Sequence, residues 1–222
     1  MARPKKSEAR DTRRDILDAA LDLFARKGFY ETSTRDIARQ VGVRESALYH
    51  HFVNKAAILH GLLDELGPGR ATQIEAVDIV ALARAMGVRE MFKNIVHMLL
   101  TEWANPREMK LTRLMVTEGY RLKSEGIISP WQHALKVRGV VASVFHKLSK
   151  AKLVRRVDPE VAAISFMGPL IMLRLLHLGM AEGAPDLKLL FAEVDGHLEF
   201  FCDNLAILNE RSAPTRRKQA SA

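Results

Sequence analysis

A short stretch near the amino end, RESALYHHF (44–52), mixes apolar residues with a serine, a tyrosine and two histidines. On a helix, which turns about 100° per residue, one side holds Val43, Ala47, Leu48, His51 and Phe52. The other side holds Glu45, Ser46, Tyr49 and His50. The apolar side can pack on neighbouring helices, whereas the other side presents hydrogen-bonding groups and a flat ring. We therefore expect the polar side to contact another molecule.

The residues before this stretch predict the helices that must position it. A first amphipathic helix ends at Gly28. A second helix begins after Ser33, which forms a capping-box pattern with Asp36, and it stops at Gly42. Together with the helix over 44–52, this short helix and its glycine-containing turn form a helix-turn-helix. In that motif the second helix lies in the DNA major groove, so the sequence indicates a DNA-binding module.

Residues around the motif suit contacts with DNA. The hydroxyl of Thr34 and the free N–H groups at that helix start form a phosphate site, and Lys55 can hold a second phosphate. Arg35 could reach a guanine edge, and Arg44 can reach forward from the start of its helix. Glu45 is less expected beside phosphates, so it either accepts from a cytosine amino group or discourages wrong sequences.

Each of these features also has a plainer interpretation. Short helical hairpins with a glycine turn are common and do not by themselves establish DNA binding. Tyr49 could be a half-buried packing residue. His51, on the apolar side, could have a structural or phosphate-positioning role instead of reading bases.

Composition indicates a soluble chain with an anionic partner. Of 222 residues 48% are hydrophobic, and 34 Lys and Arg against 26 Asp and Glu give a net charge of +8. Basic residues gather at the two ends.

The sequence also indicates the compartment of the protein. Cys202 is the single cysteine, which excludes an intrachain disulfide and suits the cytoplasm, and the amino end lacks the apolar core of a signal peptide. The apolar run 162–181 contains Arg174 and His177, so we expect a buried or interface helix and no membrane span.

Helical periodicity dominates the rest of the chain, so we expect an all-α fold. A break at 67–69 precedes expected helices over 71–85, 88–104, 107–124, 130–149, 159–181 and 187–209. The expected organisation is an N-terminal three-helix helix-turn-helix DNA-binding domain followed by a larger helical ligand-binding and dimerisation domain. The expected boundaries are a basic flexible tail (1–10), the DNA-binding domain (11–56), the effector-binding and dimerisation domain (57–210) and a basic disordered tail (211–222).

The ordered segments Gly28-Phe29, TSTRDIARQVGV (32–43), ESALYHHF (45–52) and NKAAIL (54–59) closely resemble the N-terminal domain of TetR-family transcriptional regulators. The resemblance implies phosphate contacts from Thr34, Tyr49, His51 and Lys55. It implies base reading by Arg35, Arg44, Glu45, Ser46 and His50. Many relatives carry glycine where this chain has Ala47, which could change how closely DNA approaches.

The resemblance also implies a homodimer formed by the last two long helices, near 159–181 and 187–209. Two apolar stripes are compatible with such an interface: Val161, Ile164, Met167, Ile171, Leu175 and Leu178, then Leu190, Val194, Leu198, Phe201 and Leu205. Gly168 and Gly179 could permit close helix approach. The alternative is that these stripes face the core of their own subunit. A two-fold dimer would recognise a palindromic operator.

Methionine and aromatic residues in the middle helices could line a cavity for a mainly apolar effector, although an ordinary core has the same composition. The candidate ligand-binding residues are Trp103, Met115, Glu118, Tyr120 and Phe145. The expected function is therefore a cytoplasmic homodimeric repressor that such a molecule releases from its operator. The alternative is a DNA-binding protein of the same fold without an effector, which would organise chromosomes or answer to a protein.

An enzyme is the more distant alternative. The chain has no His-x-x-x-His or Cys-x-x-Cys pair, no glycine-rich phosphate loop and no Gly-x-Ser-x-Gly elbow. We therefore expect no catalytic residue, no metal and no cofactor.

Overall fold

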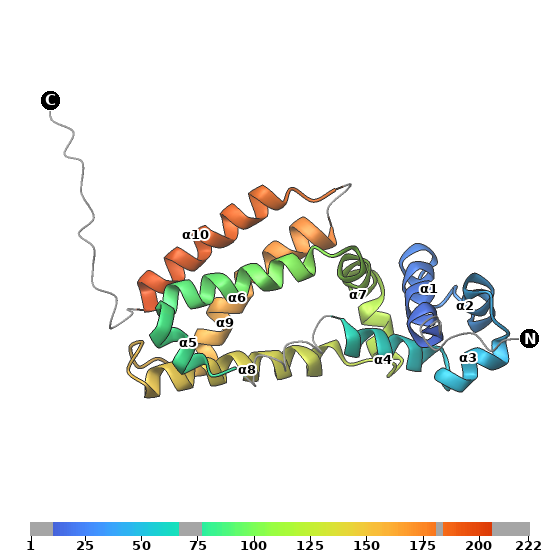
Figure 1. Ribbon diagram of the computed structural model, residues 1–222, viewed down its shortest axis with the longest axis horizontal. Coiled ribbons are helices and arrows are strands. Elements are labelled where there is room, and N and C mark those ends of the chain that lie inside the picture. Colours follow the sequence, from blue (N-terminus) through green and yellow to red (C-terminus); the bar gives the residue numbers. More distant parts are fainter. Residues whose placement is uncertain (1–10, 67–76, 181–183, 206–222) are drawn as a thin grey trace, which may run out of the picture.

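The computed structural model describes residues 11–66, 77–180 and 184–205, and over these residues the protein is helical without strands. The all-α prediction is confirmed. The helices, shown in Figure 1, are α1 (Thr12–Lys27), α2 (Thr34–Val41), α3 (Glu45–His51), α4 (Lys55–Glu65), α5 (Ile79–Met86), α6 (Val88–Trp103), α7 (Pro106–Ser124), α8 (Pro130–Lys150), α9 (Pro159–Arg174), the π-helical turn η2 (Leu175–Gly179) and α10 (Leu187–Leu205). The two expected tails, the break at 67–69, the start of the helix expected at 71 and residues 206–209 lie outside the described residues.

Short side chains set the ends of the first helices, as their sequence predicts. Gly28 caps α1 through its N–H, which bonds to the carbonyl of Phe24. At the start of α2, the Asp36 N–H donates to the Ser33 hydroxyl (3.1 Å), and the Ser33 N–H donates to the Asp36 carboxylate (3.1 Å). These reciprocal bonds satisfy donors that a helix start leaves free. The hydrogen bond from the Ser33 side chain lowers the pKa of Asp36.

Replacing Ser33 by alanine should lower the free energy of unfolding at pH 7 by about 1 kcal/mol, because the cap of α2 is lost. A carboxyl whose pKa is lowered on folding stabilises the protein above its ordinary pKa and stops doing so as the pH falls through the lowered value. The difference between wild type and Ser33→Ala should therefore narrow in acid. Urea unfolding at pH 7 and at a series of pH values below 4 measures both effects. Ser143→Ala, at an exposed mid-helix position of α8, is the control and should not destabilise the protein.

Two hydrophobic clusters divide the described chain. The first belongs to the head, residues 11–66, where α4 packs with α1, α2 and α3 through side chains such as Ile58 and Leu62. Packing thus places α4 with the head, beyond the boundary expected at residue 56. The same cluster takes in Leu111, Leu114 and Leu122 of α7 and Ile128 after it. One helix of the body is therefore built into the core of the head.

The body, residues 77–205, forms the second cluster. Helices α5, α6, α8, α9 and α10 surround a group of phenylalanines, and α7 lies between this bundle and the head (Figure 1). The Phe92 ring lies 4.9 Å from that of Phe166 and 5.5 Å from that of Phe145, and Phe201 lies 5.2 Å from Phe166. Neighbouring rings at such distances attract each other beyond the area they bury. These rings fill the middle of the body.

The stripe predicted as the dimer face of the last helix is in fact a core stripe. Leu190, Val194, Leu198, Phe201 and Leu205 are all buried inside the subunit. Leu178 of η2 is buried too, and Gly179 packs against Thr112 and Val116 of α7. Amphipathic spacing shows that a helix face is covered, but not which molecule covers it.

The other predicted stripe is exposed only in part, because Met167 and Leu175 are half-buried and Leu178 is buried. Val161, Ile164 and Ile171 of α9 are between 45% and 60% exposed, and Gly168 is exposed between them. An 18-residue window of the segment Pro159–Gly179 has a mean hydropathy of 1.8, which a membrane span would also show, and 33% of that window is buried inside the protein. Exposed apolar patches of this kind are typical of interaction surfaces.

Candidate nucleic-acid interface

The turn between α2 and α3 sets the direction in which the chain leaves α2 and begins α3. Gly42 adopts a left-handed conformation (φ +78°), and the N–H groups of Gly42 and Val43 both donate to the Ala38 carbonyl. Glycine suits this backbone region because it has no Cβ. The tight turn closes α2 and sets the start of α3, which is seven residues long.

Helix α3 buries one side and exposes the other. Leu48 is fully buried and Phe52 nearly so, whereas Tyr49 is 48% exposed and Ser46 and His50 are exposed. Val43 and Ala47 are half-buried. The predicted division of faces is confirmed at these positions. It is wrong for His51, which is exposed. Helix α3 ends at this residue and Phe52 follows with an extended backbone, so the helical period no longer relates His51 to the buried Phe52.

The polar residues at the α2–α3 junction form one hydrogen-bonded group. The Thr34 hydroxyl donates to a carboxylate oxygen of Glu45 (2.8 Å) and lies 3.3 Å from the hydroxyl of Tyr49. The other oxygen of Glu45 is 3.5 Å from Nε of Arg35. The carboxylate that was unexpected beside phosphates is thus paired with Arg35. Because Arg35 is 77% exposed, this ion pair is weak and leaves the guanidinium mobile.

The ammonium of Lys55 does not point outward, as the predicted phosphate contact would require. Its ammonium donates to the carbonyls of Phe29 (2.6 Å), Thr32 (2.6 Å) and Tyr30 (3.4 Å), and it sits 4.4 Å from the centre of the Phe29 ring. Burial lowers the pKa of Lys55, while Glu118 opposes that shift. An ammonium has three donors, so these carbonyls use its bonding capacity. The structure thus directs this group into the head instead of toward a phosphate.

The remaining expected DNA contacts are on the surface. Arg44, Ser46, His50 and His51 are exposed around α3, and Arg44 immediately precedes the helix. Together with Thr34, Arg35 and Tyr49 they are referred to here as the α3 face. Lys55 does not belong to it, and Glu45 supports it from within.

The five expected ligand residues do not come together. Tyr120 is 88% exposed, whereas Phe145 is fully buried in the aromatic core. Trp103 lies under the guanidinium of Arg174, 4.6 Å from its ring centre, and Met115 packs on the head cluster. Glu118 accepts hydrogen bonds from the backbone of the head. A pocket lined by all five is therefore excluded, and an effector contact from any one of them stays a prediction.

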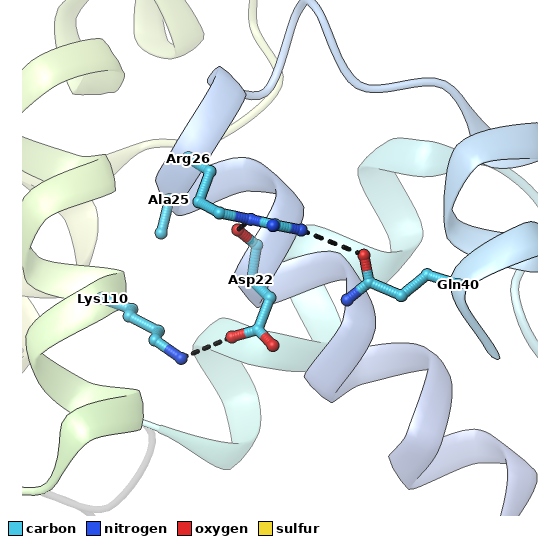
Figure 2. A pocket seen from close by; sticks show the side chains of 5 residues that line it. All are labelled: Asp22, Ala25, Arg26, Gln40 and Lys110. Carbon is cyan, nitrogen blue, oxygen red and sulfur yellow. Dashed lines mark hydrogen bonds and ion pairs between the residues drawn. The ribbon is translucent and has the colours of Figure 1, made fainter.

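Residues of α7 that the sequence did not single out join the body to the head. Arg107 is 2.7 Å from carboxylate oxygens of both Asp18 and Glu65, and Lys110 pairs with Asp22 of α1. The Lys110–Asp22 pair borders an open cleft of about 460 Å³, in which Arg26 donates a hydrogen bond to Gln40 between α1 and α2 (Figure 2). Helical spacing on α7 could have placed both basic residues on the face that carries Leu111 and Leu114, but not their partners.

Metal ligation has no support among the residues that the structure describes, since no three His, Cys, Asp or Glu side chains gather there. The described surface instead presents the α3 face and exposed apolar side chains on α9 such as Val161 and Ile164.

Comparison with known proteins shows that this chain is similar to bacterial transcriptional regulators. Residues 16–62 match the sequence model described as bacterial regulatory proteins of the tetR family. The HTH-type transcriptional regulator TtgR of Pseudomonas putida is 44% identical over 66 residues, which are 30% of this chain and 31% of TtgR. The uncharacterized HTH-type transcriptional regulator TtgW of the same species is 28% identical over 128 residues, 58% of this chain and 88% of TtgW.

A solved structure shares the fold over most of the length. The SmeT–triclosan complex superposes with a TM-score of 0.66 at 18% identity, covering 89% of this chain and 93% of that chain. The sequence match is strongest in the head, where the α3 face lies, and the structural match extends over the body. Residues 16–62 therefore form the helix-turn-helix DNA-binding domain typical of TetR-family transcriptional regulators, and the chain shares the fold of SmeT over most of its length.

Proposed function

We propose that the protein is a homodimeric repressor that binds a palindromic operator and leaves it when a small, mainly apolar molecule binds the body. The observation that carries this proposal is the α3 face, whose polar side chains point outward while Leu48 and Phe52 anchor the helix behind them. Because it acts on DNA, the protein would work in the cytoplasm, and its role would be regulatory and not enzymatic.

On the α3 face each residue type suits one kind of contact. Thr34, Tyr49 and His51 would bind phosphates, and Arg35, Arg44, Ser46 and His50 would reach base edges in the major groove. Glu45 would read bases only after giving up its bond from Thr34, so we propose that it orients Thr34 and Arg35. For Lys55 we propose a structural role in place of the expected phosphate contact.

The exposed apolar face supports the dimer. On α9 and η2 it comprises Val161, Ile164, Ile171, Met172 and Leu176, and on α10 it comprises Leu189 and Phe200. Among the described residues, no atom lies within 4 Å of where a Cβ would sit on Gly168 or Gly196. A partner helix could therefore approach closely at both glycines. A second copy related by a two-fold axis would bury this face and place two α3 helices on successive turns of one duplex side.

The aromatic core of the body supports an apolar effector. Phe92, Phe145, Phe166 and Phe201 already pack on one another, so a ligand with aromatic rings could replace some of these contacts after the helices part. SmeT, which shares the fold, was solved with triclosan.

A thermal-shift screen of aromatic compounds tests the proposed effector, because a ligand at 100 times its Kd stabilises a protein by about 2.7 kcal/mol. Compounds that stabilise the protein should also lower operator affinity. If none does both, the effector-free alternative replaces this proposal.

Replacing His50 by alanine should weaken binding to the selected operator by about 1–3 kcal/mol, because a base contact is lost. The operator is first selected from random duplexes, and affinity is then measured at one fixed salt concentration. His60→Ala is the matched control, since His60 is an exposed histidine of α4 outside the α3 face. Equal affinities of the two variants would place the reading surface elsewhere.

A further inference from the structure

The backbone of Phe29 joins three parts of the protein. Its N–H follows the end of α1, where Gly28 already uses its own N–H to cap the helix. Both oxygens of Glu118, on α7 of the body, accept from that Phe29 N–H, at 2.9 and 3.1 Å. Its carbonyl accepts from Lys55, the first residue of α4. Charge-assisted bonds of this kind are stronger than those between neutral groups.

Gly28 makes room for the carboxylate. A Cβ at this position would lie 2.0 Å from one oxygen of Glu118 and 3.2 Å from its carboxyl carbon. The φ angle of Gly28 is +87°, which other residues rarely adopt. Both the space and the backbone conformation therefore depend on glycine. The approach of α7 to this point is specific and is not an incidental surface contact.

Further hydrogen bonds from within the head also hold the loop 28–32. Lys55 also binds the carbonyl of Thr32, and the buried Thr32 hydroxyl donates to the carbonyl of Gly28 (2.8 Å). One turn beyond Glu118, the guanidinium of Arg121 stacks 3.6 Å from the centre of the Tyr30 ring. The loop thus has little freedom to move relative to α7.

This loop leads directly into the DNA-reading unit. Ser33, the N-cap of α2, follows Thr32, and Lys55 stands just after α3. Both ends of the α2–α3 unit are consequently tied to Phe29, and Phe29 is tied to the body through Glu118. A shift of α7 would be passed to α3 through this connection.

We propose that Glu118 is a positioning residue that sets the orientation of the α2–α3 unit relative to the body, and thereby the half-site spacing that a dimer accepts. The inference rests on the proposed dimeric function. It assigns Glu118 no contact with DNA or with an effector. Its loss should relax spacing selectivity while leaving the affinity of a single head for a half-site unchanged.

The first measurement is amide hydrogen exchange in the full chain. In Glu118→Ala, the Phe29 amide should exchange about tenfold faster or more, as expected when a hydrogen bond to a charged group is lost. Glu118→Gln keeps one acceptor oxygen and should show a smaller increase. Asp64→Asn removes an exposed carboxylate from α4 and should leave this amide unchanged. Unaltered exchange in Glu118→Ala would overturn the proposal.

The second measurement compares the selected palindrome with versions carrying one or two extra central base pairs. Wild type and Asp64→Asn should lose about tenfold or more in affinity on the lengthened duplexes, because the heads no longer fit two half-sites. Glu118→Ala should lose clearly less, with unchanged affinity for a single half-site. Unfolding of part of the sample would lower all affinities together and leave the ratio intact.

The outcomes separate the two proposals. If exchange rises but the spacing preference of Glu118→Ala equals that of wild type, Glu118 ties the loop without positioning the head, and the inference is wrong. If wild type itself binds a lone half-site as tightly as the palindrome, the dimeric function fails, and the positioning role fails with it.

Discussion

Replacing Ile164 by glutamate should convert the protein to a monomer and weaken operator binding by about 100-fold or more. Ile164 is 54% exposed on α9, in the apolar face that a second copy would cover. An unpaired charge buried in an interface costs about 3–5 kcal/mol, and two-fold symmetry introduces it twice. Each 1.4 kcal/mol changes an equilibrium about tenfold, so the dimer should not persist at micromolar concentration. Sedimentation and operator titration measure the two effects.

Met98→Glu provides the matched control for this substitution. Met98 is 57% exposed on α6, so the same charge enters at nearly the same exposure, but outside the apolar face of α9 and α10. This variant should remain dimeric and bind the operator normally. Both variants should keep the helical circular dichroism of wild type, since neither position is in the core. An Ile164→Glu protein that still sediments as a dimer would place the interface on another surface.

Replacing Lys55 by methionine should destabilise the head and leave the salt dependence of DNA binding unchanged. Without the ammonium, the carbonyls of Phe29 and Thr32 lose their short hydrogen bonds. Leaving buried acceptors unsatisfied costs about 1–3 kcal/mol, and methionine preserves most of the packing volume. Denaturant unfolding measures the stability, and operator titration over a range of salt concentrations measures the slope.

A lysine that neutralised a phosphate would behave differently. Its loss would reduce the slope of log affinity against log salt by about one for each contact removed. Lys150→Met, on the exposed end of α8, is the control for the loss of a positive charge outside the head. If Lys55→Met reduced the slope of log affinity against log salt and left the free energy of unfolding unchanged, Lys55 would contact a DNA phosphate. That result would contradict the structural role proposed from the contacts of its ammonium.

Local signals in the sequence predicted the helix-turn-helix well. The capping box of Ser33 and Asp36 and the left-handed Gly42 each act over a few residues, so their types and spacing suffice. The outward position of Tyr49 and the inward position of Leu48 followed from the helical period for the same reason. His51 was placed wrongly because α3 ends at that residue, so the helical period no longer relates it to the buried Phe52.

Long-range partners could not be predicted in this way. Lys55 and Glu118 meet at Phe29, 26 and 89 residues along the chain, and nothing in their local sequence marks that meeting. The stripe of α10 has the spacing of an interface helix, yet Phe201 and its neighbours pack against α9 and α6 of the same subunit. Both outcomes depend on how separate helices dock.

Taken alone, the sequence determined the type of DNA-binding domain at residues 16–62, the all-helical fold and the outward face of α3, because caps, turns and helical periodicity are properties of neighbouring residues. Only the tertiary structure decided that α4 and part of α7 complete the head, and that Lys55 and Glu118 hold the loop before α2 from opposite sides. The tertiary structure also decided that the stripe of α10 is buried within the subunit, whereas part of the stripe of α9 stays exposed. The physical reason is that burial and hydrogen bonding between distant helices are set by their packing, which no local pattern encodes.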